Sequence, residues 1–118
     1  MGGYRLLDGK VVIGLSERIT IKNSKGKRTV EAKIDTGATK SSIDVELAKQ
    51  LHLGPVITSK MVKSAHGYML RPVVKATIAI AGKTLTEDFT LADRNHLKYA
   101  VLIGQNILKH GFLIDPLK

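Results

Sequence analysis

The chain has 118 residues and no cysteine, which fits one compact domain and excludes a disulfide framework or a thiolate metal site. Its 43% hydrophobic residues suffice for a core, and no apolar run approaches the roughly 20 residues of a membrane span. The formal charge of +9 fits either a solvated basic surface or a surface for acidic partners. We therefore expect a single domain over residues 1–118 of a soluble, cytoplasmic protein that does not bind a membrane.

The first part of the chain predicts strands. Two apolar runs, residues 11–13 and 19–21, have β-branched side chains, and residues 23–27 have the composition of a hairpin loop. The next segment, RTVEAKID, alternates between apolar and charged residues, as a half-buried strand does. Asp35 ends this segment on the face opposite the apolar side chains, where the strand meets a glycine-containing turn.

The later part predicts short helices among further strands. Residues 41–54 change to helical spacing, with Ser42 or Asp44 as a candidate N-cap and Gly54 at the end. Two strand-like arms then flank the turn SAHGY, and the segments KTLTEDFTLAD, YAVLIG and FLID read as strands. QNILKHG predicts a second short helix. The elements together indicate a mostly β domain, largely antiparallel, with one or two short helices.

The tripeptide Asp35-Thr36-Gly37 carries the candidate chemistry. A lone carboxylate can act as a general base or bind a cation, whereas two carboxylates that share one proton can hydrolyse an amide without a metal. Gly37 lets the backbone bend and brings N–H groups near the carboxylate, and the Thr36 hydroxyl can brace the loop. Ala38 places a methyl group beside it. Such a tripeptide is also an ordinary turn, so its context must decide.

That context resembles a known superfamily. The segments AKIDTGATKSSI and AVLIGQNIL resemble those of the retropepsin superfamily of aspartic proteases. Together with VVIGLSERITI and RPVVKATIAIAGKTLTEDFTLADR, they resemble the prokaryotic ATP-dependent zinc protease family over nearly the whole chain. Members of that family are similar to retropepsins in fold and are associated with ligases that add glutamate to protein C-termini. The resemblance implies a small closed antiparallel barrel, with Asp35, Thr36 and Gly37 as catalytic residues.

The chain departs from the resemblance in two respects. Viral retropepsins often have an ion pair where this chain has Thr39 and Gln105, and the loss of both charges permits a neutral hydrogen bond instead. The family name also mentions zinc and ATP, but this chain lacks the residues that would bind them. The chain has no phosphate loop, and no two histidines stand at a metal-ligand spacing. We therefore predict no cofactor and no metal.

A second carboxylate has to come from elsewhere, because no other aspartate of the chain stands in an Asp-Thr-Gly sequence. The simplest prediction is a homodimer in which Asp35 of each subunit meets the other on a two-fold axis. The resemblance implies that the terminal segments KVVIG and FLID supply the strands that join the subunits.

The segment KSAHGYM, residues 63–69, lies where a retropepsin has its flap. A flap closes over an extended peptide and excludes water, with Gly67 as a flexible tip. An ordinary hairpin with a glycine turn is the alternative. The predicted substrate-binding residues are Ala38, Ala65, His66, Gly67, Tyr68 and Ile103.

The function predicted from these features is that of an aspartic endopeptidase, active as a homodimer and directed by its basic charge to acidic or glutamate-rich peptides. The alternative is a catalytically inactive retropepsin-like dimer that serves as a basic binding module for an acidic protein, a ribosome or a nucleic acid. Nucleic acid is not favoured, because only 4% of the residues are aromatic. A metal-binding β protein that uses Asp35 is a third reading.

Overall fold

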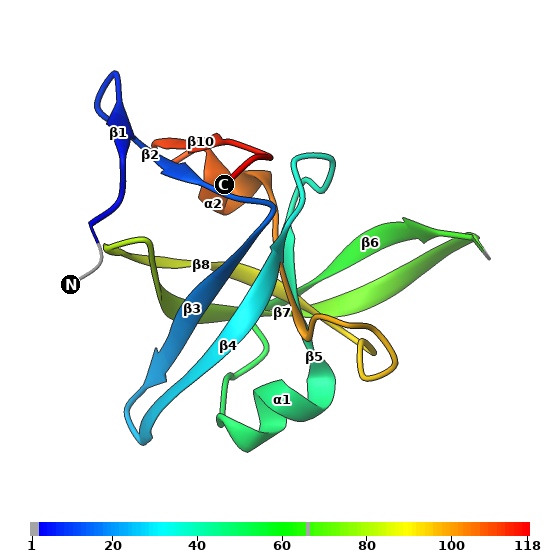
Figure 1. Cartoon of the computed structure of the whole chain (residues 1–118). Helices are drawn as coiled ribbons and strands as arrows, with labels where there is room; N and C mark the ends of the chain where they lie inside the picture. Colours follow the sequence, from blue (N-terminus) through cyan, green and yellow to red (C-terminus); the bar gives the residue numbers. More distant parts are fainter. Residues whose placement is uncertain (1–2, 66) are drawn as a thin grey trace.

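The computed structural model describes residues 3–65 and 67–118. Twelve elements follow one another along this part of the chain (Figure 1). The strands are β1 (Leu6–Leu7), β2 (Lys10–Ile13), β3 (Ser16–Asn23), β4 (Gly26–Ile34), β5 (Ser41–Asp44), β6 (Thr58–Ser64), β7 (Gly67–Ile80), β8 (Lys83–Ala92), β9 (Val101–Ile103) and β10 (Phe112–Ile114). The helices are α1 (Val45–Gln50) and α2 (Gln105–Leu108).

Six of the strands close into a barrel. Their order is β3-β4-β9-β5-β8-β7, and β7 pairs back with β3 to complete the ring. The neighbours β4–β9 and β5–β8 run parallel, whereas the other four neighbouring pairs are antiparallel. The predicted mostly β fold with a small closed barrel and two short helices is therefore confirmed, with the two parallel pairs as an added feature.

The barrel closes around the apolar faces that the alternation predicts. Ala32 and Ile34 of β4 are buried, whereas Glu31 and Lys33, which alternate with them, are exposed. Each fully buried isoleucine contributes about 1.5–3 kcal/mol relative to an exposed one. The fully buried large side chains come from most strands of the barrel and from α2, and they include Ile19, Ile21, Ile43, Ile78, Ile80, Phe89, Val101, Ile103 and Ile107.

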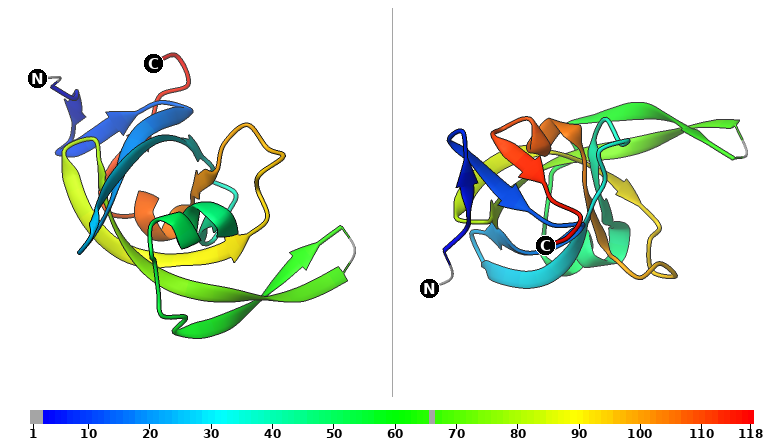
Figure 2. Two further views of the ribbon diagram at one scale, coloured as in Figure 1. Left: turned by 90° about the horizontal axis from the view of Figure 1, so that it is seen from below. Right: turned by 45° about the horizontal axis from the view of Figure 1, so that its top comes forward.

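A long hairpin leaves the barrel on the side away from the two termini (Figure 2). It consists of β6 and the first half of β7, which pair from Thr58↔Val73 to Ser64↔Gly67. In the residues that the structure describes, β6 pairs with β7 alone. Several large apolar side chains of this hairpin are exposed, namely Met61, Met69, Leu70 and Tyr68, the last at 70% near the tip.

The terminal strands form a separate three-stranded sheet. β2 lies in its centre, antiparallel to β1 and parallel to β10. The Asp115 N–H also donates to the Ile13 carbonyl oxygen at 2.8 Å, and Lys118 Nζ lies 2.9 Å from Glu17 Oε2. The segments KVVIG and FLID, which were expected to join two subunits, thus pair with each other within one chain. The centre strand β2 has both edges occupied, so a subunit contact through this sheet has to use an outer edge.

Helix α1 begins where its sequence predicts. Asp44 is its N-cap, because its carboxylate accepts from the N–H groups of Glu46 and Leu47, whereas Ser42 lies within β5. The chain leaves the helix after Leu51, with His52 in the left-handed region at φ 55°. Neither helix of the described residues is long and apolar enough to span a membrane.

Candidate active site

Asp35 stands at the end of β4, where the chain leaves the barrel wall. Its N–H donates to the Ile103 carbonyl oxygen at 2.9 Å, which ties the start of the loop to β9. Its carboxylate is half-buried and accepts from the Gly37 N–H at 2.9 Å. A β-carbon on Gly37 would lie 3.4 Å from Asp35 Oδ1, which is about an ordinary contact distance. Gly37 thus lies against the carboxylate and holds it with a backbone hydrogen bond.

The connection between β9 and α2 supports this loop from behind. The Gln105 N–H donates to the Ala38 carbonyl oxygen, and Gln105 Nε2 donates to the Thr36 carbonyl oxygen, both at 2.8 Å. A neutral hydrogen bond does stand where viral retropepsins often have an ion pair, and its acceptor is the backbone of Thr36. Thr39 takes part through its carbonyl oxygen, which accepts from the Asn106 N–H at 3.3 Å.

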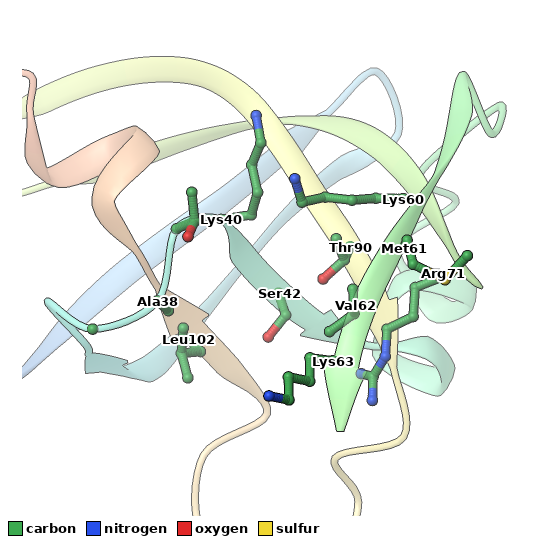
Figure 3. A pocket seen from close by; sticks show the side chains of 12 residues that line it. Ala38, Lys40, Ser42, Lys60, Met61, Val62, Lys63, Arg71, Thr90 and Leu102 are labelled. Carbon is green, nitrogen blue, oxygen red and sulfur yellow. The ribbon is translucent and has the colours of Figure 1, made fainter. Parts of the chain in front are cut away.

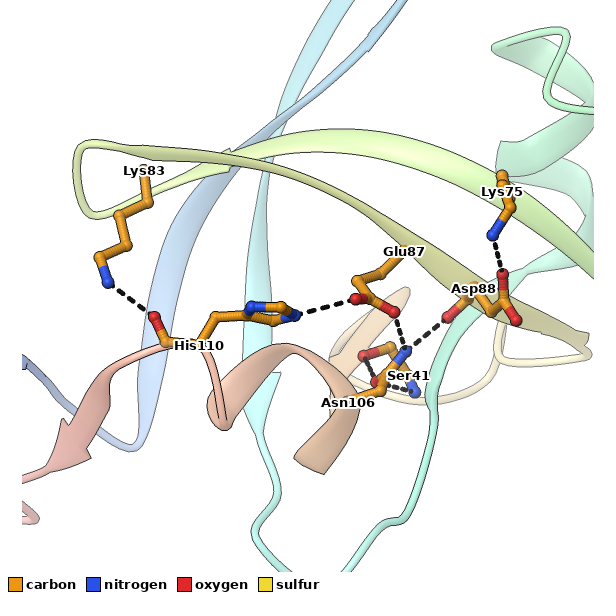
Figure 4. Close-up of polar contacts among 7 residues, drawn as sticks. All are labelled: Ser41, Lys75, Lys83, Glu87, Asp88, Asn106 and His110. Atoms are coloured by element: carbon orange, nitrogen blue, oxygen red, sulfur yellow. Dashed lines mark hydrogen bonds and ion pairs between the residues drawn. The ribbon is translucent and has the colours of Figure 1, made fainter.

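A buried polar network extends from the loop to the surface (Figure 4). Asn106 Oδ1 accepts from the Ser41 N–H at 3.0 Å and from Ser41 Oγ at 2.8 Å, and Ser41 Oγ accepts from the Gly104 N–H at 2.9 Å. Asn106 Nδ2 donates to the Asp88 carbonyl oxygen at 2.9 Å. Glu87 lies at the outer end, with His110 Nε2 at 2.9 Å from its Oε2. The network fixes β5, β8 and α2 against one another directly behind the Asp35 loop.

A cavity of about 470 Å³ lies between this loop and the β6–β7 hairpin (Figure 3). Lys40 and Lys60 lie at one end of it, and Lys63 and Arg71 lie at the other. The described residues that line it include no acidic side chain. A second cavity of about 230 Å³ continues past Lys40 and Lys60. The other lining residues of the first cavity are Gly37, Ala38, Thr39, Ser42, Met61, Val62, Thr90 and Leu102.

The predicted site residues fall into separate groups. Gly37 and Ala38 line the cavity, beside Asp35. Ile103 is fully buried in the core, so its side chain does not face the cavity. Leu102 points to the opposite face of β9 and lines the cavity in its place, which corrects the prediction for Ile103. Alternation along YAVLIG carried this signal, because adjacent strand residues face opposite sides.

The predicted flap residues lie at the tip of the hairpin, beyond the cavity wall. Ala65, Gly67 and Tyr68 are exposed, and Gly67 has φ 106°, a conformation that favours glycine. His66, also predicted to contact substrate, lies outside the described residues. The part of the hairpin that lines the cavity is its middle, from Lys60 to Lys63 on β6 and at Arg71 on β7.

Two arginines near the site had no signal in the sequence. Arg71 faces Lys60 across the hairpin and lines the cavity. Arg94 lies in the loop that follows β8. Its backbone N–H donates to Asp44 Oδ1 at 2.8 Å, and its side-chain Nε donates to the Tyr99 carbonyl oxygen at 3.0 Å. Burial lowers the pKa of Arg94, and the charge of Arg71 adds to this effect, while Asp44 and Asp35 oppose it. Arg94 is thus close enough to both Arg71 and Asp35 to respond to their charges.

The described residues offer no group of three or more His, Asp or Glu side chains that could hold a metal ion. Of the histidines placed by the structure, His110 pairs with Glu87 and His52 stands at the end of α1.

Comparison with known proteins gives the site a context. Residues 46–118 match the model of a family described as the retropepsin-like aspartic endopeptidase RimB. A curated protein from Shewanella halifaxensis (strain HAW-EB4), named a probable alpha-L-glutamate ligase, is 25% identical over 92% of this chain. The chain spans only 29% of the length of that relative.

Several solved structures share the fold. Protein Lpg0085 of Legionella pneumophila, of unknown function, superposes with a TM-score of 0.64 at 22% identity, over 91% of this chain and 94% of its own. The simian foamy virus (mac) protease superposes with a TM-score of 0.59 at 17% identity, over 80% of this chain and 91% of its own. The EIAV protease in complex with the inhibitor HBY-793 superposes with a TM-score of 0.63 at 18% identity, over 80% of this chain and 84% of its own. The barrel, the loop after β4 and the hairpin are therefore those of a retropepsin fold.

Proposed function

The chain belongs to the RimB-like family of retropepsin-like aspartic endopeptidases, and we propose that it is an aspartic peptidase whose catalytic group is Asp35. The family match begins at residue 46, after the Asp35 loop, so the assignment of Asp35 rests on its own surroundings. The observation that carries it is the position of this carboxylate, which accepts from the Gly37 N–H in a loop whose residues from Gly37 to Lys40 line a cavity next to the hairpin. Thr36 and Gly37 act as the residues that shape the catalytic loop.

The proposed reaction is the addition of water to a peptide carbonyl. One carboxylate of a pair removes a proton from water as the oxygen attacks the carbonyl carbon, and the other gives its proton to the carbonyl oxygen. The tetrahedral intermediate then collapses: the C–N bond breaks, the nitrogen leaves with the proton taken from water, and one hydroxyl of the intermediate returns its proton to the other carboxylate, which restores the pair with one shared proton. The hydrogen bonds from Gln105 hold the loop in place during these steps, because they fix the carbonyl groups of Thr36 and Ala38, which follow Asp35 in the chain.

The second carboxylate is proposed to be Asp35 of another copy of the chain. Other aspartates have structural partners of their own. Asp44 caps α1, Asp88 lies 2.8 Å from Lys75 Nζ, and Asp115 accepts from the Leu117 N–H at 2.9 Å. The retropepsins that the fold resembles act as dimers, which supports a homodimer with one Asp35 from each subunit.

The proposed substrate is a peptide that is extended under the β6–β7 hairpin, with Ala38 at the cavity wall and Ala65, Gly67 and Tyr68 at the tip that closes over it. The hairpin offers backbone groups for strand-like pairing. The cations at both ends of the cavity favour acidic residues on both sides of the cleaved bond. The name of the glutamate ligase relative points to the same class, so glutamate-rich peptides are the first to test.

The test compares wild type with Asp35→Asn on a library of acidic peptides, with products identified by mass spectrometry. Asp8→Asn is the matched control, because Asp8 is exposed in the turn between β1 and β2 and asparagine tolerates its left-handed backbone. We expect cleavage by wild type and by Asp8→Asn, and none by Asp35→Asn. Sedimentation of the same proteins measures the dimer. A strict monomer that still cleaves peptides would contradict the shared site.

A second function is supported by the four cations of the cavity and the absence of acidic side chains from its described lining. An inactive dimer of this kind would serve as a basic binding module for an acidic protein. The same variant separates the two functions, because Asp35→Asn removes a negative charge near the cations. It abolishes proteolysis and leaves the binding of acidic ligands intact or slightly stronger.

A further inference from the structure

Arg71 has an unusual environment for an arginine at a protein surface. Its Nε is buried and has no hydrogen-bond partner, although the side chain as a whole is only half-buried. Its Nη2 contacts Met69 Sδ at 3.7 Å, and a thioether sulfur is a weak acceptor. Among the described residues, no carboxylate lies within ion-pair distance of the guanidinium, since the five ion pairs there all involve other cations. The guanidinium at the cavity wall is therefore left without a charged partner, and its Nε–H without any acceptor.

The neighbours of Arg71 increase the positive charge at this end of the cavity. Lys63 lines the same end of the cavity from the facing strand of the hairpin, where it pairs with Tyr68 (Figure 3). Arg94 is near enough for the charge of Arg71 to lower its pKa, and the first cause of that lowering is burial. The side chain of Arg94 is held by the Tyr99 carbonyl oxygen, so it does not turn freely into solvent. Like charges kept this close repel one another unless an anion lies between them.

We infer that Arg71 is a specificity-determining residue, whose guanidinium binds one carboxylate side chain of the peptide in the cavity. A carboxylate offers two acceptor oxygens in the spacing that two N–H groups of a guanidinium match, and it neutralises the clustered charge. The lysines at the other end of the cavity lack such a planar set of donors. Binding of a carboxylate at the Arg71 end therefore depends on its orientation, whereas binding at the lysine end depends mainly on its charge.

This inference rests on the proposed function in one respect, which is that a peptide occupies the cavity. Its test does not need cleavage. In the Asp35→Asn background, the binding of a fluorescein-labelled peptide with a run of glutamates between leucines is measured by fluorescence anisotropy. The same measurement is made with variants of the peptide in which one glutamate at a time is replaced by glutamine.

Arg71→Gln is expected to weaken binding of the all-glutamate peptide about tenfold or more, because a hydrogen-bonded charge pair is lost. One glutamine peptide, the one that lacks the carboxylate bound by Arg71, should lose little further affinity in this variant. Such non-additivity at one peptide position identifies a direct contact. Arg71→Lys keeps the charge but not the planar donors, so it should restore only part of the affinity. Thermal unfolding and circular dichroism verify that each variant is folded.

Arg28→Gln is the matched control, because it removes the same charge from an exposed site on β4 that does not line this cavity. Equal weakening by Arg28→Gln and Arg71→Gln, or equal losses at every glutamate position, would overturn the inference, since the cavity would then sense net charge alone. Absence of peptide binding would overturn it too. So would a DNA duplex that displaces the peptide and whose own affinity falls more than that of the peptide when Arg71 is replaced. Binding that depends on Arg71 without any cleavage by wild type would leave the inference standing and refute the proposed peptidase.

Discussion

Gly104 and Lys40 are in such close contact that a β-carbon on Gly104 would lie 2.6 Å from the Lys40 carbonyl oxygen. The same β-carbon would lie 2.8 Å from the Ala38 carbonyl oxygen. Glycine is therefore required here by space, because both neighbours are backbone atoms that cannot turn aside. The contact sets how closely the β9–α2 connection supports the loop that carries Asp35.

Substitution of Gly104 by alanine should displace the loop. Overpacking of this kind costs about 1–3 kcal/mol, which urea unfolding measures as a lower midpoint. The displaced loop should also lose the hydrogen bonds from Gln105 to Thr36 and Ala38, so peptide cleavage should fall more than stability does. Gly3→Ala is the control, because nothing lies within 4 Å of the added β-carbon. Equal stability and activity in the two variants would refute the requirement for glycine.

Asn106 offers a test of the buried network. It is 5% exposed. Its amide oxygen accepts from the Ser41 N–H and hydroxyl, and its amide nitrogen donates to the Asp88 carbonyl oxygen. Asn106→Ala removes the acceptor of the Ser41 N–H and of the Ser41 hydroxyl proton, although Ser41 Oγ still accepts from the Gly104 N–H, and each buried unsatisfied group costs about 1–3 kcal/mol. We expect a loss of unfolding free energy in this range or above it, and faster hydrogen exchange of the Ser41 amide.

Asn95→Ala is the comparison for this substitution, because Asn95 is exposed in the loop after β8. Its effect should stay within about 0.5 kcal/mol, as for most surface substitutions. Unchanged exchange at Ser41 in Asn106→Ala would show that the network does not hold β5.

The sequence predicts the strand before Asp35 well, because period-two alternation is a local property. Val30, Ala32 and Ile34 mark the inner face of β4, and Asp35 follows on the side that the pattern indicates. The N-cap at Asp44 is predicted for the same reason, since capping needs only the next few residues. The hairpin of β6 and β7 is likewise evident from two strand patterns around a glycine turn.

Contacts between distant segments could not be predicted in this way. Ser41 meets Asn106 across 65 positions, and their hydrogen bonds depend on how the barrel closes. Arg71 enters the cavity because the long β7 bends away from the barrel, and nothing in its neighbours in sequence signals this. The intramolecular pairing of β2 with β10 also depends on tertiary structure, and it places the terminal segments differently from the expected subunit contact.

Asp44 connects the first helix to the region around the cavity. Its carboxylate accepts from Glu46 N–H at 3.2 Å and Leu47 N–H at 3.3 Å, and also from the Arg94 N–H at 2.8 Å. Asp44→Ala should cost about 1–3 kcal/mol, since it removes a cap and leaves buried donors unpaired. Asp44→Asn retains one acceptor oxygen and should lose less. Urea unfolding measures the loss of stability in each variant, and Asp93→Ala is the control because Asp93 is exposed. Equal losses in Asp93→Ala and Asp44→Ala would contradict the role of Asp44 as a cap.

The tip of the β6–β7 hairpin gives a test of the flap. Replacement of residues 65–68 by two glycines removes the exposed Tyr68 and shortens the tip, while the cavity-lining residues from Lys60 to Lys63 are kept and only Lys63 loses its cross-strand partner. If the tip closes over a peptide, kcat/KM should fall sharply, because closure excludes water and orders the substrate. Stability should change little, since the tip contributes no buried side chain among the described residues. Unchanged kinetics would identify an ordinary hairpin.

Salt dependence tests the role of the cations in the cavity. Lys40, Lys60, Lys63 and Arg71 line it, and no acidic side chain of its described lining offsets their charge. Attraction between such a cleft and a charged substrate falls steeply with ionic strength, because the screening length shortens to about 8 Å near physiological salt. We expect kcat/KM for a glutamate-rich peptide to fall about tenfold between low and physiological salt.

The matched control for this measurement is the same peptide with glutamine in place of glutamate, whose kcat/KM should change little over the same range of salt. The variant Lys40→Gln with Lys60→Gln removes two of the four cations and should reduce the slope of the salt dependence for the glutamate peptide. Arg71→Gln should lower the affinity for one peptide position as well as the slope, because its contact is directional. Equal salt dependence for the glutamate and glutamine peptides would show that the cations act on the stability of the enzyme or of its dimer, and that they do not select an acidic substrate.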